Sequence, residues 1–350
     1  MATEIAPEST LESASALAQF DAELEGQQME GHWRGAVGLP TEPRGRIQPY
    51  IWKWDLVYRQ LLRAGELVPL DGREGRRTLR LLNPGRGFTT HTIHMSVQLV
   101  KPGEIAEAHR HTLAALRFVV QGSGAYTSVE GERFPLHAGD LILTPQWTWH
   151  DHGNESAEPI VWLDGLDSPL VSALDAGFFE PYPEATQPVT RPEGWTLEQS
   201  GLLRPARHGG TATCPTAFYP WEIVSQQLER RAASDAGSPY DGVVLEYANP
   251  FTGGPTLPTI GCWLQLLRPG EQTRRHRHTS SGIFYVVRGS GCTVVQDTRL
   301  NWSRGDVFVV PNWSWHSHEN RSGSEDAVLF SMNDIPIYDA FGLYREQPED

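Results

Sequence analysis

An internal repeat is the feature that most constrains the fold of this 350-residue chain. The segment 98–104 (QLVKPGE) recurs as 265–271 (QLLRPGE), 167 positions later. The same spacing relates His109-Arg110-His111-Thr112 to His276-Arg277-His278-Thr279. After the next loop the spacing is 166, and it matches Gly139-Asp140 to Gly305-Asp306 and Trp147-Thr148-Trp149-His150 to Trp313-Ser314-Trp315-His316. Matches at a near-constant spacing indicate one structural unit written twice.

Each copy of the repeat is predicted to form short β-strands separated by turns. Strand-like runs such as Thr92–Val100 and Leu141–Thr144 are bounded by Gly, Pro and Asp, and Val119-Val120 leads into the Gly-Ser-Gly turn at 122–124. Several short strands at this spacing favour a sandwich or barrel that closes its own edges. We therefore predict an all-β protein with two such units in tandem.

The remaining segments are expected to be helical or to connect the two units. Ser9-Thr10-Leu11-Glu12 fits a capping box that opens a helix running towards Gly26, and a second helix is predicted over Trp54–Ala64. The stretch 187–220 is rich in Pro, Gly, Thr and Arg, which is typical of a connection. We predict an N-terminal helical arm (1–70), a first, catalytic barrel (71–185), a connector (186–235) and a second barrel (236–350).

The composition excludes several classes of function. A formal charge of −14 disfavours a nucleic-acid partner, although local arginines can still bind an anionic substrate. The apolar runs are too short for a membrane span, and Met1–Thr10 lacks the apolar segment of a secretory signal, so we expect a cytoplasmic protein. Cys214, Cys262 and Cys292 are too scattered for a disulfide framework and are expected to be reduced.

Three histidines of the first unit form a candidate metal site. His109 and His111 precede an apolar run, and the two-residue period of a strand would point both imidazoles to one face. His150 would supply a third ligand. The alternative is a hydrogen-bonded or surface pair, but eight of the thirteen histidines fall in matched pairs across the repeat, which favours metal binding. Fe, Mn, Ni, Cu and Zn all accept imidazole.

These residues carry a resemblance to a known family. Gly103-x5-His109-x-His111 and Gly139-x5-Pro145-x-Trp147-x2-His150-x3-Asn154 resemble the two cupin motifs. Ala115 stands where the usual first motif has a glutamate ligand, so a three-histidine site is expected. Together with Arg117–Val120, Trp149–Asn154 and Trp162–Asp167, this departure is similar to the gentisate 1,2-dioxygenase family, which includes the salicylate and 1-hydroxy-2-naphthoate enzymes. The resemblance extends from about Tyr50 to Tyr344.

The resemblance implies a bicupin of two tandem jelly-roll β-barrels with a short helical N-terminal region. It also implies Fe(II) on His109, His111 and His150, dioxygen as co-substrate, and a homotetramer. The expected reaction is an extradiol-type cleavage of gentisate or a related ortho-hydroxy aromatic acid between the carboxyl- and hydroxyl-bearing carbons. Salicylate and 1-hydroxy-2-naphthoate are the alternative substrates. A non-redox metal cupin (isomerase or decarboxylase) and a binding bicupin are the alternative classes.

Five further residues are expected at the first site. Arg117 is the first choice to bind the substrate carboxylate, because alternation along one extended run would place it on the face of His109 and His111. Its alternative is a pair with a core carboxylate. Arg76 matches a second family arginine, or is a solvated charge. His152 is the expected base or hydrogen-bond donor beside the metal.

Asp164 and Gln98 match family positions that orient the site. Asp164 would fix a histidine tautomer, with a structural hydrogen bond as the alternative. His94 stands where the salicylate enzyme resembled by this chain has a tryptophan, so the accepted ring substituents are left open.

The second unit serves as an internal control. All three ligands recur as His276, His278 and His316, and His152 recurs as His318. However, Arg117 becomes Phe284 and Asp164 becomes Ser331. We therefore expect ring cleavage in the first unit, with the second histidine set either a further metal site or a remnant of duplication.

Overall fold

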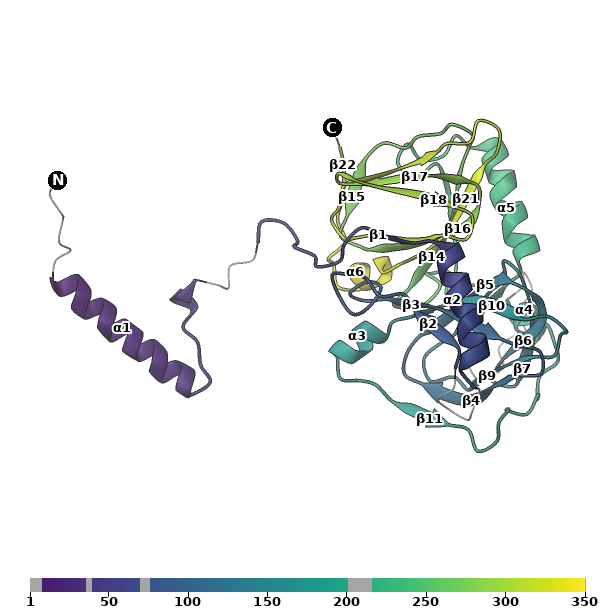
Figure 1. Ribbon diagram of the computed structural model, residues 1–350, viewed down its shortest axis with the longest axis horizontal. Coiled ribbons are helices and arrows are strands. Elements are labelled where there is room, and N and C mark those ends of the chain that lie inside the picture. The colour runs from purple at the N-terminus through teal and green to yellow at the C-terminus, as the bar shows by residue number, and fades with distance from the viewer. Residues whose placement is uncertain (1–7, 36–39, 70–75, 201–215, 350) are drawn as a thin grey trace. The chain divides into compact units, whose positions relative to one another are not determined.

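The computed structural model describes residues 8–35, 40–69, 76–200 and 216–349 (Figure 1). The chain divides into two units, Met1–Arg44 and Gly45–Asp350. In the first unit, helix α1 (Glu8–Gly26) confirms the predicted N-terminal helix and is followed by the 3-10 helix η1 (His32–Arg34). The capping side chains expected at Ser9–Glu12, and Cys214, lie outside the described residues. Among the described helices, none is both long and apolar enough to span a membrane.

The first half of the larger unit is built from two antiparallel sheets. The six-stranded sheet has the order β12-β8-β5-β10-β3-β2, and the five-stranded sheet has the order β11-β4-β9-β6-β7. The strands are β2 (Thr78–Arg80), β3 (His94–Val100), β4 (Ile105–His111), β5 (Ala115–Gln121), β6 (Ser123–Val129), β7 (Glu132–His137), β8 (Leu141–Thr144), β9 (His150–Asn154), β10 (Ile160–Leu166), β11 (Phe179–Pro181) and β12 (Phe218–Tyr219).

The second half repeats this arrangement. Its six-stranded sheet has the order β1-β19-β16-β21-β14-β13, and its five-stranded sheet has the order β18-β17-β20-β15-β22. The strands are β1 (Tyr50–Trp52), β13 (Val243–Glu246), β14 (Gly261–Leu267), β15 (His276–His278), β16 (Gly282–Arg288), β17 (Ser290–Val295), β18 (Thr298–Ser303), β19 (Val307–Val310), β20 (His316–Asn320), β21 (Ala327–Asn333) and β22 (Glu346–Pro348).

The predicted all-β, two-unit fold is confirmed. Each half is a pair of separate sheets, so the expected closing of the barrel edges by hydrogen bonds is not found among the described strands. The helix predicted over Trp54–Ala64 is confirmed as α2 (Trp54–Leu67). The other helices are α3 (Ser168–Ala173), α4 (Trp195–Ser200), α5 (Trp221–Ser234) and α6 (Ile335–Ala340). The proposed boundaries at 70, 185 and 235 stay a prediction.

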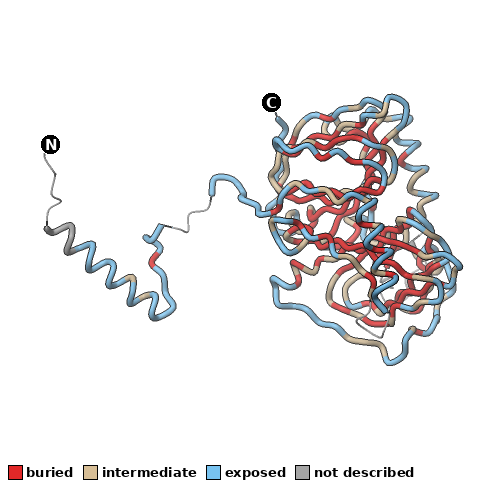
Figure 2. Tube along the Cα trace, viewed as in Figure 1, coloured by how far each residue is buried: buried red, intermediate tan, exposed pale blue. Residues whose placement is uncertain are grey.

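The largest apolar core lies between the two six-stranded sheets. Phe118 on β5 stacks on Phe330 on β21, with ring centroids 4.2 Å apart, and both side chains are buried. Full burial of one such ring stabilises the fold by about 2 kcal/mol. The alternate residues of β5, Arg117 and Val119, point the other way, into the interior of the first half, where Val119 packs with Trp162. Figure 2 shows the buried segments concentrated in these sheets.

The two halves exchange their first strands. Strand β1 precedes α2 and the first half, yet it pairs with β19 of the second half. Strand β12 precedes α5 and the second half, yet it pairs with β8 of the first. Asp306 accepts a 2.8 Å hydrogen bond from the first amide of α2, at Trp54, and Asp140 accepts one of equal length from the first amide of α5, at Trp221. A carboxylate at a helix N-terminus also interacts favourably with the helix dipole.

The Gly-Asp pair of the repeat has its explanation at these two helix starts. A Cβ atom on Gly139 would lie 2.3 Å from Trp221, and one on Gly305 would lie 2.6 Å from Trp54. Both glycines also have a positive φ, 95° and 92°. Only glycine meets both conditions without strain.

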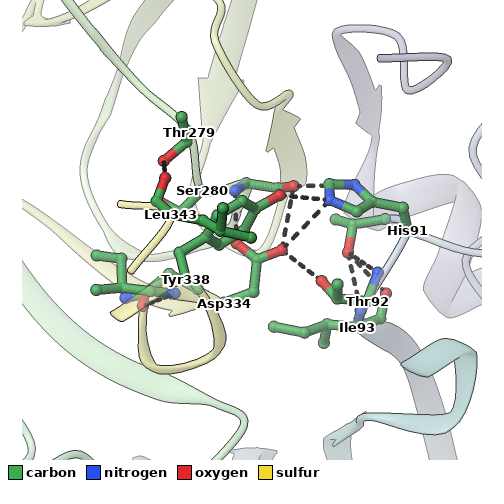
Figure 3. A network of polar contacts seen from close by, with 12 residues as sticks. His91, Thr92, Ile93, Thr279, Ser280, Asp334, Tyr338 and Leu343 are labelled. Carbon is green, nitrogen blue, oxygen red and sulfur yellow. Dashed lines mark hydrogen bonds and ion pairs between the residues drawn. The ribbon is translucent and has the colours of Figure 1, made fainter. Parts of the chain in front are cut away.

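Buried carboxylates join the two halves reciprocally. Asp167 accepts hydrogen bonds from the Ala114 amide (2.9 Å) and the Thr259 hydroxyl (2.8 Å). At the matching place Asp334 accepts from the Ser281 amide (2.7 Å) and the Thr92 hydroxyl (Figure 3). Each carboxylate therefore binds groups of both halves, and Asp334 also lies 3.8 Å from His91 Nε2 of the first half.

Candidate metal centres and substrate pocket

The three histidines predicted as ligands come together in the first half. His109 and His111 lie on β4, and His150 begins the neighbouring β9, where it is in register with His109. All three are buried, and one nitrogen of each lies within 4.8 Å of the others. The antiparallel pairing of β4 with β9 therefore brings the three histidines together.

Hydrogen bonds fix the protonation of these imidazoles. The Nδ1 atoms of His109, His111 and His150 lie 2.7, 2.9 and 2.9 Å from the backbone carbonyls of Glu107, Leu113 and Thr148. A carbonyl only accepts, so each Nδ1 carries the proton and each Nε2 keeps a lone pair. His150 Nε2 is buried without a hydrogen-bond partner in the described chain. A buried acceptor that lacks a donor and lies beside the Nε2 atoms of His109 and His111 fits a metal ion.

Burial keeps the three imidazoles neutral. It lowers the pKa of His109 to about 3, with Arg76 as the next cause, and the pKa of His111 to about 4. The pKa of His150 is also held well below its ordinary value, chiefly by burial. Neutral imidazole is the metal-binding form, so ligation needs no proton removal near neutral pH.

Arg117 reaches the same interior by a different route from the one predicted. The single extended run is wrong, because residues 112–114 separate β4 from β5 and the two strands belong to different sheets. Arg117 faces Asp164 across β5 and β10, with Nε 3.1 Å from Oδ1, and its Nη1 donates to Thr144 Oγ1 at 3.1 Å. Burial lowers the pKa of Arg117 to about 10, so the side chain stays cationic at neutral pH.

Asp164 pairs with arginine instead of fixing a histidine tautomer. The backbone carbonyls described above hold the ligand tautomers, which corrects the predicted role. The contact with Arg117 is an ion pair without hydrogen-bond alignment, since Arg117 Nε and Asp164 Oδ1 have no hydrogen-bond partner in the described chain. Burial raises the pKa of Asp164, while Arg117 and then Arg76 lower it.

Arg76 lies at the centre, so its alternative as a solvated charge is wrong. Its Nη2 is 3.1 Å from both ring nitrogens of His109. An atom equidistant from both nitrogens lies beside the ring and leaves the Nε2 lone-pair direction open. Arg76, Arg117 and Asp164 together give the surroundings of the triad one excess positive charge, which suits a carboxylate ligand.

His152 and Gln98 both belong to the interior. His152 is two residues after His150 on β9, and its Nδ1 lies 2.8 Å from Thr127 Oγ1. Its Nε2 is buried without a partner in the described chain, and burial, then Arg117, holds its pKa well below the ordinary value. Gln98 is buried on β3 opposite Trp162. His152 is therefore neutral, with one nitrogen free to face a ligand.

Two side chains that contact the site, Phe179 and Thr144, were not predicted from the sequence. Phe179 on β11 stacks on His109 with centroids 5.3 Å apart, and Thr144 holds Arg117. Neither belongs to a recognisable motif, so the sequence carried no signal for them. His94 Nε2 accepts a 3.2 Å hydrogen bond from Arg80, and burial lowers its pKa to about 4.

The second histidine set also converges. One nitrogen from each of His276, His278 and His316 lies within 4.8 Å of the others. The predicted substitutions are in register, since Phe284 faces Ser331 across β16 and β21 as Arg117 faces Asp164. His318 Nδ1 lies 2.8 Å from Thr293 Oγ1, as in the His152 pair. The second half thus keeps the ligands and loses the arginine and aspartate.

The paired sandwiches, each with a histidine triad that could hold a metal ion, define a bicupin, and the Cupin domain family matches residues 96–165 and 263–333. The chain is 46% identical over 317 residues to the 5-aminosalicylate 1,2-dioxygenase of Comamonas sp (88% of this chain, 84% of the relative). It is 44% identical over 354 residues to a 1-hydroxy-2-naphthoate 1,2-dioxygenase of Nocardioides sp. (98% and 90%). The salicylate 1,2-dioxygenase of Pseudoaminobacter salicylatoxidans, solved as an adduct with gentisate, superposes with a TM-score of 0.87 at 32% identity (100% and 97%). The chain belongs to the gentisate 1,2-dioxygenase family of ring-cleaving dioxygenases.

Proposed function

We propose that this dioxygenase uses Fe(II) held by His109, His111 and His150 and cleaves gentisate or a related ortho-hydroxy aromatic acid. The bond broken lies between the carboxyl- and hydroxyl-bearing carbons. The observation that carries the proposal is a neutral histidine triad beside two arginines and one aspartate. When bound, a ferrous ion on three imidazoles supplies open positions for the substrate oxygens and dioxygen.

The substrate carboxylate is bound by the arginines of the pocket. Arg117 is oriented by Asp164 and Thr144, and Arg76 stands beside His109. A carboxylate there neutralises the excess positive charge and forms charge-assisted hydrogen bonds in a desolvated site. Both arginines are therefore assigned to substrate binding, where the sequence had favoured Arg117.

His152 is assigned to the substrate hydroxyl. Thr127 fixes its Nδ1 side, which leaves Nε2 to hold or accept a proton at the phenolic oxygen. Gln98 lines the same interior and is assigned to orienting the substrate. Ring cleavage balances with both atoms of one dioxygen incorporated into the acid, so no further reductant is needed.

The four candidate substrate acids differ in the substituent on the aromatic ring. Gentisate and 5-aminosalicylate both carry a donor group para to the hydroxyl, salicylate has none, and 1-hydroxy-2-naphthoate has a fused ring. The relative at 46% identity is named for 5-aminosalicylate, and the relative at 44% identity is named for 1-hydroxy-2-naphthoate. His94, fixed by Arg80 on the inward face of β3, is proposed to contact the ring or its substituent.

Oxygen uptake tests the proposal. Protein loaded anaerobically with Fe(II) is mixed with each of the four acids in air-saturated buffer, and dioxygen, substrate and ring-opened product are measured. We expect equimolar loss of dioxygen and acid for at least one of them, and no uptake with Zn(II)-loaded protein. Acid binding without oxygen uptake would support the binding bicupin, and turnover without oxygen would support an isomerase or decarboxylase. The homotetramer and the cytoplasmic location stay predictions.

A further inference from the structure

The two histidine triads have opposite electrostatic surroundings. His109 and His276 occupy the same position of the repeat. In the first half Arg76 Nη2 lies 3.1 Å from His109 Nε2. In the second half the charged neighbour is a carboxylate, with Asp241 Oδ1 3.7 Å from His276 Nε2. The ring nitrogen that faces the centre therefore meets a cation in one half and an anion in the other.

A second carboxylate comes from the last strand of the chain. Strand β22 pairs with β15 as β11 pairs with β4, so Glu346 faces His278 where Phe179 faces His111. Glu346 Oε1 lies 3.2 Å from His276 Nδ1, the nitrogen that in His109 donates to a backbone carbonyl. A carboxylate on the far nitrogen of an imidazole makes that imidazole a stronger metal ligand and fixes its orientation.

Two imidazole nitrogens of the second centre face each other and share a positive charge. His316 Nδ1 lies 2.9 Å from the Ser314 carbonyl and carries the proton there. With Glu346 on His276 Nδ1, both Nε2 atoms present lone pairs, and they are 2.9 Å apart. Two lone pairs at this distance repel each other unless a proton on one nitrogen or a metal ion bound to both lies between them, and metal titration distinguishes the two cases. His278, whose Nδ1 lies 2.9 Å from the Ser280 carbonyl, completes the set.

The second centre has little room for an aromatic acid. The cavity over it measures about 30 Å³, which is room for one or two water molecules. Phe284 and Ser331 occupy the places of Arg117 and Asp164, and no arginine is found among the described residues that line the cavity. The second centre therefore offers an aromatic carboxylate no arginine comparable to Arg117.

We propose that the second half holds a resident divalent transition-metal ion on His276, His278 and His316, with Asp241 as a carboxylate ligand and Glu346 as the partner that orients His276. The ion balances the two carboxylates and links β22, β15 and β20 with the segment that precedes β13. It takes no part in ring cleavage. This proposal does not rest on the substrate or metal assigned to the first centre.

Cobalt binding tests the proposal without measuring turnover. The His109→Ala variant, which weakens the first centre, is stripped of metal and titrated with Co(II), whose visible absorption reports coordination. We expect about one Co(II) per chain, with an absorption band of a four- or five-coordinate site, and a rise in thermal midpoint. Asp241→Asn and Glu346→Gln in this background should each weaken Co(II) binding at least about tenfold, as losses of ligands or their partners do.

Asp235→Asn is the matched control, because Asp235 lies in the same segment and pairs with Arg231 near the surface. It should leave Co(II) affinity unchanged. No Co(II) binding by a folded His109→Ala variant would overturn the proposal. If Asp241→Asn and Glu346→Gln both kept the full Co(II) affinity, the assignment of the two carboxylates to this site would be wrong. These isosteric changes keep the test decisive if larger substitutions fail to fold.

Discussion

Arg117 Nε lies 3.1 Å from Asp164 Oδ1 at the point where β5 and β10 run in register. The pair is buried and imperfectly aligned, so Arg117 keeps hydrogen-bonding capacity for a further anion. Removing one partner of a buried ion pair costs about 3–5 kcal/mol because the other charge is left uncompensated. Substitutions at this pair therefore affect stability and substrate binding together, and the two effects must be separated.

Arg117→Met is expected to retain first-centre metal and to lose kcat/KM. Loss of a desolvated charge-assisted contact of about 2–5 kcal/mol corresponds to roughly thirty- to several-thousand-fold. The variant should also be less stable, because Asp164 loses its partner. The double variant Arg117→Met/Asp164→Asn should recover thermal stability without recovering kcat/KM. Recovery of both would mean that Arg117 acts only as a structural partner of Asp164.

Arg117→Lys should fall between wild type and Arg117→Met. Lysine restores the charge but lacks the planar two-donor fork that fits a carboxylate. Steady-state kinetics with iron content measured on the same samples checks the order. Equal kcat/KM for the Lys and Met variants would argue against a bidentate contact.

Arg76→Met is expected to raise KM at least about tenfold, which corresponds to about 1.4 kcal/mol. Its stability effect should be small, because the neighbours of Arg76 are a neutral imidazole and a carboxylate already paired with Arg117. Arg133→Met, which removes an ion pair with Glu155 and a contact with the Tyr126 ring remote from the triad, is the control and should leave KM unchanged. A wild-type KM in the Arg76 variant would leave Arg117 as the sole carboxylate ligand.

Replacing His109, His111 or His150 by Ala should abolish ring cleavage and lower iron content, since a site that loses one of three ligands binds weakly. His137→Ala, at an exposed side chain, is the control. His276→Ala should keep turnover per first-centre iron within about twofold. Complete inactivity of a folded His276 variant that retains this iron would show that the second half takes part in catalysis.

Gly139→Ala and Gly305→Ala should each destabilise the protein by about 1–3 kcal/mol, because each adds a clash with a tryptophan to a strained positive φ. Gly177→Ala is the matched control, since its Cβ would meet no atom within 4 Å. Chemical denaturation measures the three free energies of unfolding. A loss no larger than in the Gly177 variant would show that the helix starts can shift to accommodate a side chain.

The repeat made the fold and both histidine triads predictable, because ligand spacing and strand period survive in both copies. The inward position of Arg117 was predicted from a wrong geometry, because the alternation of side chains along one strand was continued through residues 112–114 into β5. The prediction still gave the right face, because β4 and β5 belong to two sheets that face the same interior. Asp241 lies outside a strand and Glu346 lies near the chain end. Because Phe179 stands where Glu346 would repeat, comparing the copies gave no signal for a carboxylate.

The exchange of strands was equally hidden, because β1 and β12 are three and two residues long and their partners are remote in sequence. Short strands have weak patterns, and pairing is decided by which sheet edge is available. From the sequence alone, each half was expected to form its sheets from its own strands. The pairing of β1 with β19 shows that the halves share strands.

The reciprocal placement of β1 and β12 bears on the origin and synthesis of the chain. A single module with the same leading strand would complete its sheet only on a second copy, which is the arrangement of a strand-exchanged dimer. During translation β1 leaves the ribosome long before Val307–Val310, its partner, has been made. A chain interrupted between the halves would carry an unpaired leading strand and an uncovered β8 edge, a combination that favours association with another copy over folding alone.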